Sequence, residues 1–390
     1  MVNIDEQKIE ELLSRGVEEV IDKENLRKKL LSGKVLRIKL GIDPTSPNIH
    51  LGRAISLLKL RDFQDLGHKA IFIIGDSTAV IGDSSDKDSE RPMLDPEQVK
   101  KHSKTYLKQV LKILDKRGIE VHYNSEWLKK LGWLDIAKMA NLFGLHEFSS
   151  REVIARRMEA GKRVSYLEMM YPLFQAYDSV MVRADVELGG TDQRFNLLTG
   201  RRVQQFYGQE SQDIIMTPLI EGLDGRKMSS SFGNTINLTD SLTDIFGKIM
   251  SLKDEFIEKY FMLTTRVSLE EIRNIIKIPN HRDQKARLAF EVVKMYYGEK
   301  EAKKAEEEFN KTFRDRKPDF TKVRYPAKEV AILDLLVELH LASSKSEAKR
   351  LILQKAVKIN GKTQEDWQKN IQTSIGMKIQ VGPRKFLELI

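Results

Sequence analysis

The chain has 390 residues, more than one domain usually holds, so roughly two or three domains are expected. It is 41% hydrophobic and carries a net charge of +9 at pH 7, which favours polyanionic partners such as RNA, DNA or an acidic membrane surface. Because the chain has no cysteine, we exclude disulfides and thiolate chemistry. No apolar run approaches the ~20 residues of a membrane span, which excludes a transmembrane helix, and the acidic start excludes a signal peptide. We therefore expect a cytoplasmic protein.

The first half of the chain alternates apolar, strand-like runs with amphipathic helical stretches, a pattern typical of a parallel sheet wrapped by helices. Strands are predicted at residues 35–42, 70–75 and 120–123, and helices at 51–66 and 97–116. Ligands of such doubly wound sheets lie beyond the carboxyl ends of the strands. The polar segments 43–53 and 76–83 both follow predicted strands, so they are candidate ligand-binding loops.

The middle of the chain is mostly helical. Residues 127–173 contain few strand candidates and are interpreted as an insertion between the halves of the sheet, whereas residues 185–193 and 214–219 return to strand and loop character. Further helices are predicted at residues 242–252, 254–261, 269–276, 281–297 and 301–313. A basic stretch with prolines, residues 314–326, is predicted to be a linker.

The last sixty or so residues form a separate small unit. A hydrophobic helix is predicted at residues 330–340, and the spacing of Ser344 and Glu347 is typical of a capping box that opens a second helix. Short strands are expected at residues 357–359 and 378–381, with Asn360-Gly361 favouring a tight hairpin. The second helix is strongly basic through Lys345, Lys349, Arg350 and Lys355. The arrangement resembles the alpha-L RNA-binding motif, which makes these four residues candidate RNA ligands.

Two short strings carry candidate phosphate chemistry. In the first, Gly41-Ile-Asp-Pro-Thr45 runs into His50-Leu-Gly-Arg53 where a strand gives way to a helix. The N-terminus of that helix directs backbone N–H groups and partial positive charge at a bound phosphate. Gly52 leaves room for adenine against the backbone.

The second string is Gly225-Arg-Lys-Met-Ser-Ser-Ser231, in which Lys227 supplies a mobile positive charge and Ser229 and Ser231 supply short donors. In this order the two strings resemble the ATP-handling signatures of class I aminoacyl-tRNA synthetases. That resemblance implies amino-acid activation, in which an already ionised carboxylate attacks the α-phosphate of ATP. Such chemistry needs alignment and cations rather than a general base.

Two further strings narrow the resemblance. Tyr171, Gln175 and Asp178 are three and four residues apart and therefore share one helical patch. The string Leu188-Gly-Gly190-Thr-Asp192-Gln193 is a glycine-rich turn that carries a carboxylate and an amide. Together with the C-terminal module, they make nearly the whole chain similar to tyrosyl-tRNA synthetases.

This resemblance implies roles for residues on the tyrosine side of the site. Tyr171, Gln175 and Asp83, with Thr78 nearby, would hold the amino group of tyrosine, and Asp178 would accept its phenolic hydroxyl. Gln193 would lie near the substrate carboxylate. A buried acceptor for the hydroxyl selects against phenylalanine, because phenylalanine leaves that acceptor unpaired. Lys39 completes the predicted tyrosine-binding set and stands where many bacterial relatives have a tyrosine.

On the ATP side, the resemblance implies that Thr45, His50 and Lys227 act on the phosphates, while Lys87 and Arg91 grip pyrophosphate from a loop. Gly190 and Asp192 would hold the ribose, and backbone around Leu219 would meet adenine. The predicted ATP-binding set is Gly41, Asp43, Gly52, Arg53, Gly190, Asp192, Leu219, Lys227, Ser229 and Ser231. Two positions depart from the signatures: Arg53 replaces a histidine and Ser230 replaces a lysine. The second change leaves Lys227 as the sole cation of the signature Lys227-Met-Ser-Ser-Ser231.

We therefore predict an α/β protein with a Rossmann-like doubly wound parallel sheet and a helical insertion, an all-helical domain, and a small α+β RNA-binding module. The expected boundaries are 1–235, with the insertion around 127–173, then 236–318 for anticodon recognition, and 327–390 for the RNA-binding module. The resemblance implies ATP with Mg²⁺ as substrate, no permanently bound metal, tRNA(Tyr) as partner, and a homodimer with the insertion as its contact region.

Three alternatives stay open on the sequence alone. Tryptophanyl-tRNA synthetases share the fold, but they ordinarily lack the C-terminal module and have no use for a carboxylate that faces a phenol. A small-molecule nucleotidyltransferase would share only the first string. A catalytically weakened paralogue that acts as an RNA-binding protein is suggested by Arg53 and Ser230.

Overall fold

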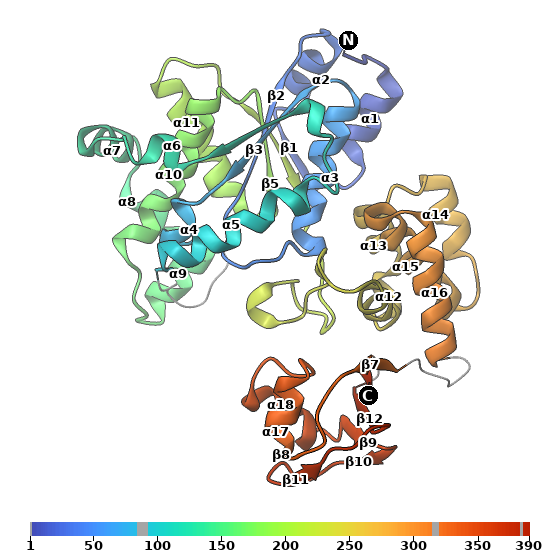
Figure 1. Ribbon diagram of the computed structural model, residues 1–390. Coiled ribbons are helices and arrows are strands. Elements are labelled where there is room, and N and C mark those ends of the chain that lie inside the picture. The colour runs from blue at the N-terminus through green and yellow to red at the C-terminus, as the bar shows by residue number, and fades with distance from the viewer. Residues whose placement is uncertain (1, 84–92, 314–319, 383–384) are drawn as a thin grey trace. The chain divides into compact units, whose positions relative to one another are not determined.

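The computed structural model describes residues 2–83, 93–313, 320–382 and 385–390 (Figure 1). The chain divides into two compact units. The first unit comprises Met1–Asp240 with Leu252–Leu288, and the second comprises Ser241–Ser251 with Ala289–Ile390. No helix in the described ranges is long and apolar enough to cross a lipid bilayer.

A six-stranded sheet forms the centre of the first unit, in the order β1-β6-β5-β2-β3-β4. Its strands are β1 (Glu19–Ile21), β2 (Arg37–Ile42), β3 (Lys69–Ile74), β4 (Ile119–Tyr123), β5 (Val186–Gly190) and β6 (Asp213–Thr217). All neighbours are parallel except β1, which runs antiparallel to β6. The structure thus confirms the predicted doubly wound parallel sheet and adds β1, which was not predicted.

The sheet is buried between helices on both faces. Residues 70–74 of β3 are fully buried, as expected for a central strand of a parallel sheet. Helix α3 (Leu51–Asp65) packs against β2, β3 and β5, while α10 (Tyr166–Val182) contacts β2 on the other face and α11 (Arg194–Phe206) contacts β5 and β6 (Figure 1). Because successive side chains of a strand point to opposite faces of the sheet, Leu40 of β2 points toward α3 and Lys39 points toward α10.

The remaining helices of the first unit surround this core. They are α1 (Glu6–Ser14), α2 (Lys23–Leu31), α4 (Thr78–Ile81), α5 (Pro96–Val110), α6 (Ser125–Leu128), α7 (Trp133–Ala140), α8 (Leu145–Ser149), α9 (Glu152–Glu159), α13 (Ile257–Thr264), α14 (Leu269–Ile276) and the first part of α15 (His281–Tyr297). The 3-10 turns are η1 (Lys116–Gly118), η2 (Thr191–Gln193), η3 (Ser230–Phe232) and η4 (Asp254–Phe256). The predicted helix 97–116 ends early, at Val110, and Asp115 caps a separate 3-10 turn by accepting a hydrogen bond from the Arg117 amide.

Helix α10 carries the predicted tyrosine-binding patch. The Ser165 side chain caps its N-terminus by accepting from the Glu168 amide, and Arg183 ends it in a left-handed conformation. Tyr171 and Asp178 are both buried on the helix face that looks toward β2. The insertion before α10 is helical, as predicted, and consists of α6 to α9.

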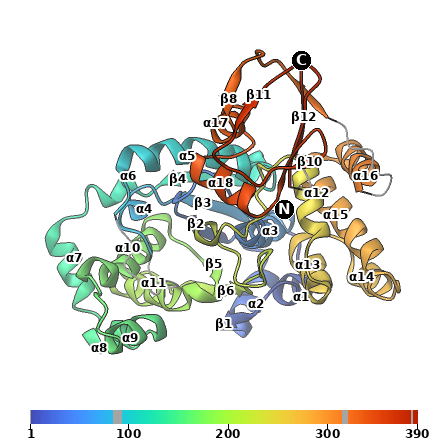
Figure 2. The ribbon, with the colours of Figure 1, turned by 90° about the horizontal axis from the view of Figure 1, so that it is seen from below.

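The second unit combines helices with a small α+β module. Helices α12 (Leu242–Met250) and α16 (Glu299–Phe313) pack together, with the rings of Phe246 and Phe309 centred 5.1 Å apart. The module contains β7 (Thr321–Val323), β8 (Glu329–Ala331), α17 (Ile332–Glu338), α18 (Lys345–Leu353), β9 (Val357–Ile359), β10 (Lys362–Thr363), β11 (Asn370–Gln372), β12 (Lys378–Val381) and β13 (Lys385–Leu389). Figure 2 shows these elements from a second side.

The module's strands form a five-stranded sheet, β10-β9-β12-β13-β7, and a two-stranded sheet, β11-β8. The Ser344 side chain accepts from the Glu347 amide, which confirms the predicted cap of α18. Asn360 and Gly361, with φ of 48° and 80°, turn β9 into β10, as a type I′ hairpin requires. Residues 321–323 lie in the predicted linker but form β7, an edge strand too short to show a period in the sequence.

Candidate active site

One cavity of about 240 Å³ opens at the carboxyl ends of β2, β5 and β6 in the first unit. This is the edge where doubly wound folds bind ligands. The cavity is lined by most of the predicted site residues: Gly41, Asp43, Thr45, His50, Gly52, Arg53, Thr78, Asp83, Tyr171, Gln175, Asp178, Gly190, Asp192, Gln193, Leu219, Lys227, Ser229 and Ser231. Residues up to 190 positions apart in sequence thus share one cavity.

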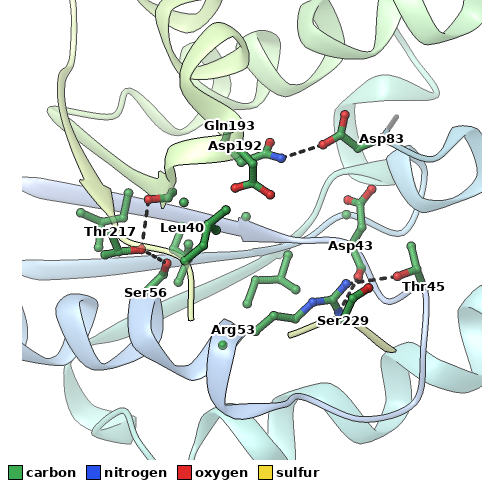
Figure 3. Close-up of a pocket in the computed structure, with 18 of the residues that line it drawn as sticks. Leu40, Asp43, Thr45, Arg53, Ser56, Asp83, Asp192, Gln193, Thr217 and Ser229 are labelled. Atoms are coloured by element: carbon green, nitrogen blue, oxygen red, sulfur yellow. Dashed lines mark hydrogen bonds between the residues drawn. The ribbon is translucent and has the colours of Figure 1, made fainter. Parts of the chain in front are cut away.

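The first string is held in place by Arg53. Its guanidinium donates to the Thr45 hydroxyl at 3.1 Å and to the Asp43 carbonyl at 3.3 Å (Figure 3). It also donates to the Tyr106 hydroxyl at 2.6 Å. These bonds tie the loop after β2 to the first turn of α3 and to α5. Arg53 therefore supports the loop that carries Thr45, in addition to lining the cavity.

His50 is the N-cap residue of α3 and is buried. Within the described residues, its Nδ1 atom has no hydrogen-bond partner. Burial, together with the positive charges of Arg53 and Lys227, lowers the pKa of His50 to about 3. At neutral pH the imidazole is uncharged, so it serves as a hydrogen-bonding group rather than as a cation.

The second string packs against the first. The Lys227 ammonium contacts the Asp192 carboxylate at 2.8 Å, and the hydroxyls of Ser46 and Ser230 lie 3.3 Å apart. Asn234 fixes the loop's backbone, since its side chain accepts from the Ser229 amide at 2.9 Å and donates to the Lys227 carbonyl at 3.0 Å. Both signature strings therefore face the same cavity, with Lys227 paired to the Asp192 carboxylate.

Two carboxylates line this cavity, the half-buried Asp43 and the buried Asp178. Asp43 accepts from the Thr78 hydroxyl at 2.7 Å and the Tyr171 hydroxyl at 3.0 Å, and burial raises the pKa of Asp43 to about 6. Asp178 accepts from Trp127 Nε1 at 2.7 Å and from Asn124 Nδ2 at 3.3 Å. Burial raises the pKa of Asp178 to about 7, while the nearby Lys39 charge and the two donors oppose that rise.

Asn124 and Trp127 were not among the predicted site residues. Asn124 follows β4 and also donates to the Thr78 hydroxyl at 2.9 Å, so it joins Thr78 to Asp178. Trp127 packs in a buried cluster with β3. Position at the carboxyl end of a predicted strand is the signal that points to Asn124, whereas no local pattern distinguishes Trp127.

Gln193 and Asp83 meet at another wall of the cavity. The Gln193 amide donates to the Asp83 carboxylate at 2.7 Å (Figure 3). Lys87 and Arg91, predicted to grip pyrophosphate, lie outside the described residues. Asp83 is the last described residue before them.

Lys39 is placed differently from the other predicted tyrosine-binding residues. It is fully buried and is absent from the cavity lining. Its ammonium group contacts Glu187 of β5 and the Gln175 carbonyl. The alternation of β2 explains this, because residue 39 faces α10 from within the sheet while the cavity opens beyond the strand's end.

The predicted RNA-binding residues lie on and after α18 in the second unit. Lys345, Arg350 and Lys355 are each about two-thirds exposed, with side-chain values of 64%, 66% and 67%. Lys349 lies over the Trp367 ring at 3.7 Å from its centre. Three ion pairs, to Asp334, Glu347 and Glu365, partly neutralise this surface.

We expect that replacing Gly75 by alanine damages the cavity directly. A Cβ atom at this position would lie 2.0 Å from Asp43 Oδ1 and 2.4 Å from Thr78 Oγ1, so the Asp43–Thr78 bond must break. Such overpacking costs about 1–3 kcal/mol of stability and should also weaken ligand binding. Thermal unfolding and calorimetric binding test this. Gly132→Ala, whose new methyl meets nothing closer than 3.5 Å, is the control; equal behaviour of the two variants would contradict the prediction.

Comparison with known proteins identifies the family. Residues 31–314 match the tRNA synthetases class I (W and Y), and residues 308–380 match the tyrosine–tRNA ligase SYY-like C-terminal domain. The chain is 44% identical over 385 residues to the tyrosine–tRNA ligase of Thermotoga maritima, covering 97% of this chain and 96% of that one. It is 42% identical over 398 residues to that of Dehalococcoides mccartyi, covering 100% of both.

Solved structures agree. The tyrosyl-tRNA synthetase of Archaeoglobus fulgidus, complexed with L-tyrosine, superposes with a TM-score of 0.62 and 26% identity, covering 77% of this chain and 99% of that one. The C-terminally truncated mitochondrial enzyme of Aspergillus nidulans, at 22% identity, matches in fold with a TM-score of 0.68 over 78% of this chain and 94% of that one. Both signature strings line one cavity, as the sequence predicted. The family match and the full-length relatives show that the chain belongs to the tyrosyl-tRNA synthetases of the class I aminoacyl-tRNA synthetase family.

Proposed function

We propose that this protein activates L-tyrosine with ATP and transfers the tyrosyl group to the 3′-terminal adenosine of tRNA(Tyr). The observation that carries the proposal is one cavity that is lined by the buried carboxylate of Asp178 and by the two ATP-type loops. Membership of the tyrosyl-tRNA synthetase family supports the same reaction.

The proposed first step joins tyrosine to AMP. A carboxylate oxygen of tyrosine bonds to the α-phosphorus of ATP, the bond to the bridging oxygen breaks, and pyrophosphate leaves. Lys227 and neutral His50 would stabilise negative charge on the phosphates, with Thr45 as a further donor. Ser229 and Ser231 would add donors from the same loop. Lys87 and Arg91 remain the proposed cations for pyrophosphate, and magnesium is expected to enter with ATP as part of that substrate.

The remaining residues would position the two substrates. Gly41, Asp43, Gly52 and Arg53 form the proposed nucleotide wall after β2. Gly190 and Asp192 are proposed for the ribose, and backbone at Leu219 for adenine. For tyrosine, the proposed set is Thr78, Asp83, Tyr171, Gln175, Asp178 and Gln193, with Lys39 acting through its neighbours.

Arg53 and Ser230, which suggested a weakened paralogue, both make contacts that suit an active site. Arg53 holds the Thr45 hydroxyl, and Ser230 lies against Ser46 of the opposite loop. ATP–pyrophosphate exchange with each amino acid tests the proposal. We expect exchange with tyrosine alone. Exchange with tryptophan, or none in folded protein, would contradict it, and the second result would favour the RNA-binding paralogue.

The pH dependence of tyrosine binding should reveal Asp178. Since the pKa of Asp178 is raised to about 7, its carboxylate is ionised above that pH and protonated below it. The protonated form is a weaker acceptor for a phenolic hydroxyl, so tyrosine affinity should fall as the pH drops from 8 to 6, by at most about tenfold per unit. Calorimetric titration measures this. Asp178→Asn should flatten the profile, and a flat profile in the unmodified protein would contradict the assignment. Asp43→Asn separates any contribution from Asp43, which titrates near pH 6.

For the C-terminal module we propose tRNA binding through α18. The double variant Lys345→Glu/Arg350→Glu should raise the KM for tRNA about tenfold or more at low salt and flatten its salt dependence, because phosphate contacts release counterions. Tyrosine-dependent exchange should stay unchanged. Lys23→Glu/Lys28→Glu on α2 changes the net charge equally and is the matched control. Equal effects of both double variants on tRNA would contradict a role for α18.

The proposed assembly is a cytoplasmic homodimer with domains near 1–235, 236–318 and 327–390. Exposed apolar side chains lie on the helical insertion, where Trp133 is 79% exposed and Leu134 and Leu145 are also exposed. Apolar surface of this kind favours a protein partner. These side chains support the insertion as the surface that a second copy covers.

A further inference from the structure

A buried ion pair lies between α10 and the sheet, apart from both signature strings. Lys39 of β2 and Glu187 of β5 are opposite each other in adjacent parallel strands, and their Nζ and Oε1 atoms are 2.7 Å apart. The two residues are 0% and 1% exposed. Desolvation makes a fully buried ion pair costly to form, so stability alone does not account for it.

Lys39 uses all three of its N–H groups. Besides Glu187, the ammonium donates to the Ser179 hydroxyl at 2.7 Å and to the backbone carbonyl of Gln175 at 2.9 Å. Both residues belong to α10, on either side of Asp178. The Lys39 charge thus anchors the turn of α10 that contributes Gln175 and Asp178 to the cavity.

Among the described residues, every hydrogen bond to the Glu187 carboxylate comes from a donor. Its Oε1 atom accepts from Lys39 and from the Gln175 amide at 3.3 Å, and its Oε2 atom accepts from the Ser179 hydroxyl at 3.1 Å and from the Gln212 amide. An ionised carboxylate accepts about four such bonds and donates none. The Gln175 amide must therefore turn its nitrogen toward Glu187, which leaves its oxygen as the acceptor for a ligand in the cavity.

We propose that Lys39 and Glu187 are positioning residues that fix the Gln175 side-chain amide with its oxygen toward the ammonium group of the bound amino acid. This inference rests on the proposed function and extends it to a buried ion pair, of which Glu187 reaches the cavity wall beside Gln175 and Lys39 does not. An amide held in the opposite orientation would present N–H donors to an ammonium group, which is repulsive.

Removing the Lys39 charge should release the amide. In Lys39→Met, Glu187 is buried without a counter-charge, and such a carboxylate neutralises by taking up a proton. The resulting hydroxyl is a donor, so Gln175 gains an arrangement in which its oxygen faces Glu187 and its nitrogen faces the cavity. The ammonium site is then lost in part of the population.

The experiment compares two ligands that share the phenol. Tyramine carries the ammonium group without the carboxylate, and 3-(4-hydroxyphenyl)propionate carries the carboxylate without the ammonium group. Their dissociation constants are measured by calorimetry on the full chain. In Lys39→Met we expect tyramine to lose at least about tenfold more affinity than 3-(4-hydroxyphenyl)propionate, with tyrosine following tyramine.

The ratio of the affinity for tyramine to the affinity for 3-(4-hydroxyphenyl)propionate reports on the orientation of the Gln175 amide. Any effect of Lys39 on Asp178 acts on the phenol and therefore changes both ligands equally. Simple loss of a positive charge would favour the cationic ligand over the anionic one, which is opposite to the expected shift. An unchanged ratio, or a shift that favours tyramine, would overturn the inference.

Lys59 provides the matched control. It is also buried, at 3% exposure, and its ammonium contacts two carbonyls and Asp62, but no cavity residue. Lys59→Met should change stability and leave the ratio unchanged; the same shift as in Lys39→Met would overturn the inference.

Ser179→Ala, which keeps the ion pair but removes the hydroxyl between its members, should shift the ratio two- to fivefold in the same direction. If Lys39→Met does not fold, Ser179→Ala is the variant that tests the inference. An unchanged affinity ratio in Ser179→Ala would then overturn it. Failure of the unmodified protein to bind tyrosine would instead contradict the proposed function itself.

Discussion

Lys227→Ala is expected to lower the rate of tyrosyl-adenylate formation by about 10²–10³-fold while leaving the affinity for tyrosine within about twofold. Lys227 lines the cavity from the second signature loop, and Ser230 occupies the position where relatives place a second lysine. The charge that builds up on the phosphates in the transition state would therefore lose a cation. Arg226 of the same loop does not replace it, because it pairs with Asp224 and is not among the residues that line the cavity.

The structure adds a reason to expect a rate effect. Lys227 contacts Asp192 at 2.8 Å, so ATP binding should exchange one anionic partner for another. Single-turnover kinetics of adenylate formation and equilibrium binding of tyrosine separate the two effects. Lys253→Ala removes a lysine that is 59% exposed and outside the cavity lining, and it should leave both unchanged. A rate within threefold of the unmodified protein for Lys227→Ala would contradict its assignment to the phosphates.

Asp178→Asn is expected to lower kcat/KM for tyrosine in pyrophosphate exchange by about 10²-fold, since a hydrogen bond to a charged group contributes about 1.5–3 kcal/mol. Trp127 Nε1 and Asn124 Nδ2 both donate to Asp178, one to each oxygen. An asparagine must place its NH₂ group against one of these donors, so the acceptor for the phenolic hydroxyl is lost together with the charge.

The same variant should lose selectivity. A site built around a buried acceptor rejects an analogue that lacks the hydroxyl; for tyrosyl-tRNA synthetases as a family, discrimination of about 10⁵ against phenylalanine is the established example, not a value derived from this structure. Activity with phenylalanine should change little in Asp178→Asn, which makes it an internal control. An unchanged ratio of kcat/KM for tyrosine and phenylalanine would contradict the role of Asp178.

The sequence predicts most of this cavity because its residues are clustered in short strings at strand ends. Thr45, His50 and Arg53 follow the strand predicted at residues 35–42, and Lys227 lies in a loop after the strand-like residues 214–219. The carboxyl ends of parallel strands meet at one edge of a sheet, so strings far apart in sequence converge there. Tyr171, Gln175 and Asp178 were predicted to share a face because helical spacing alone fixes it.

Contacts between separate strings could not be predicted in the same way. The bonds from Trp127 and Asn124 to Asp178 span 51 and 54 residues. The strand end before Asn124 indicates that it lies near the cavity, but no local pattern indicates either bond. The burial of Lys39 follows from strand alternation once β2 and β5 are known to be neighbours. Its pairing with Glu187 depends on register, which a single sequence does not reveal.

Short secondary-structure elements were also not predicted from the sequence. Strands β1, β7 and β8 have three residues each, too few for an alternating pattern to be recognised. The helix predicted at residues 330–340 begins only at Ile332, since the two residues before it extend β8. Longer elements such as α3, β3 and α14 were predicted to within one residue at each end, because their periodic patterns are complete.

Charging of tRNA tests the central claim most directly. The purified full-length protein would be incubated with ATP, labelled tyrosine and total bacterial tRNA, and the acylated tRNA would be sequenced. We predict that tyrosine is attached through the 3′-terminal adenosine and only to tRNA(Tyr). Charging with another amino acid, or no charging by protein that binds both tyrosine and tRNA, would contradict the account.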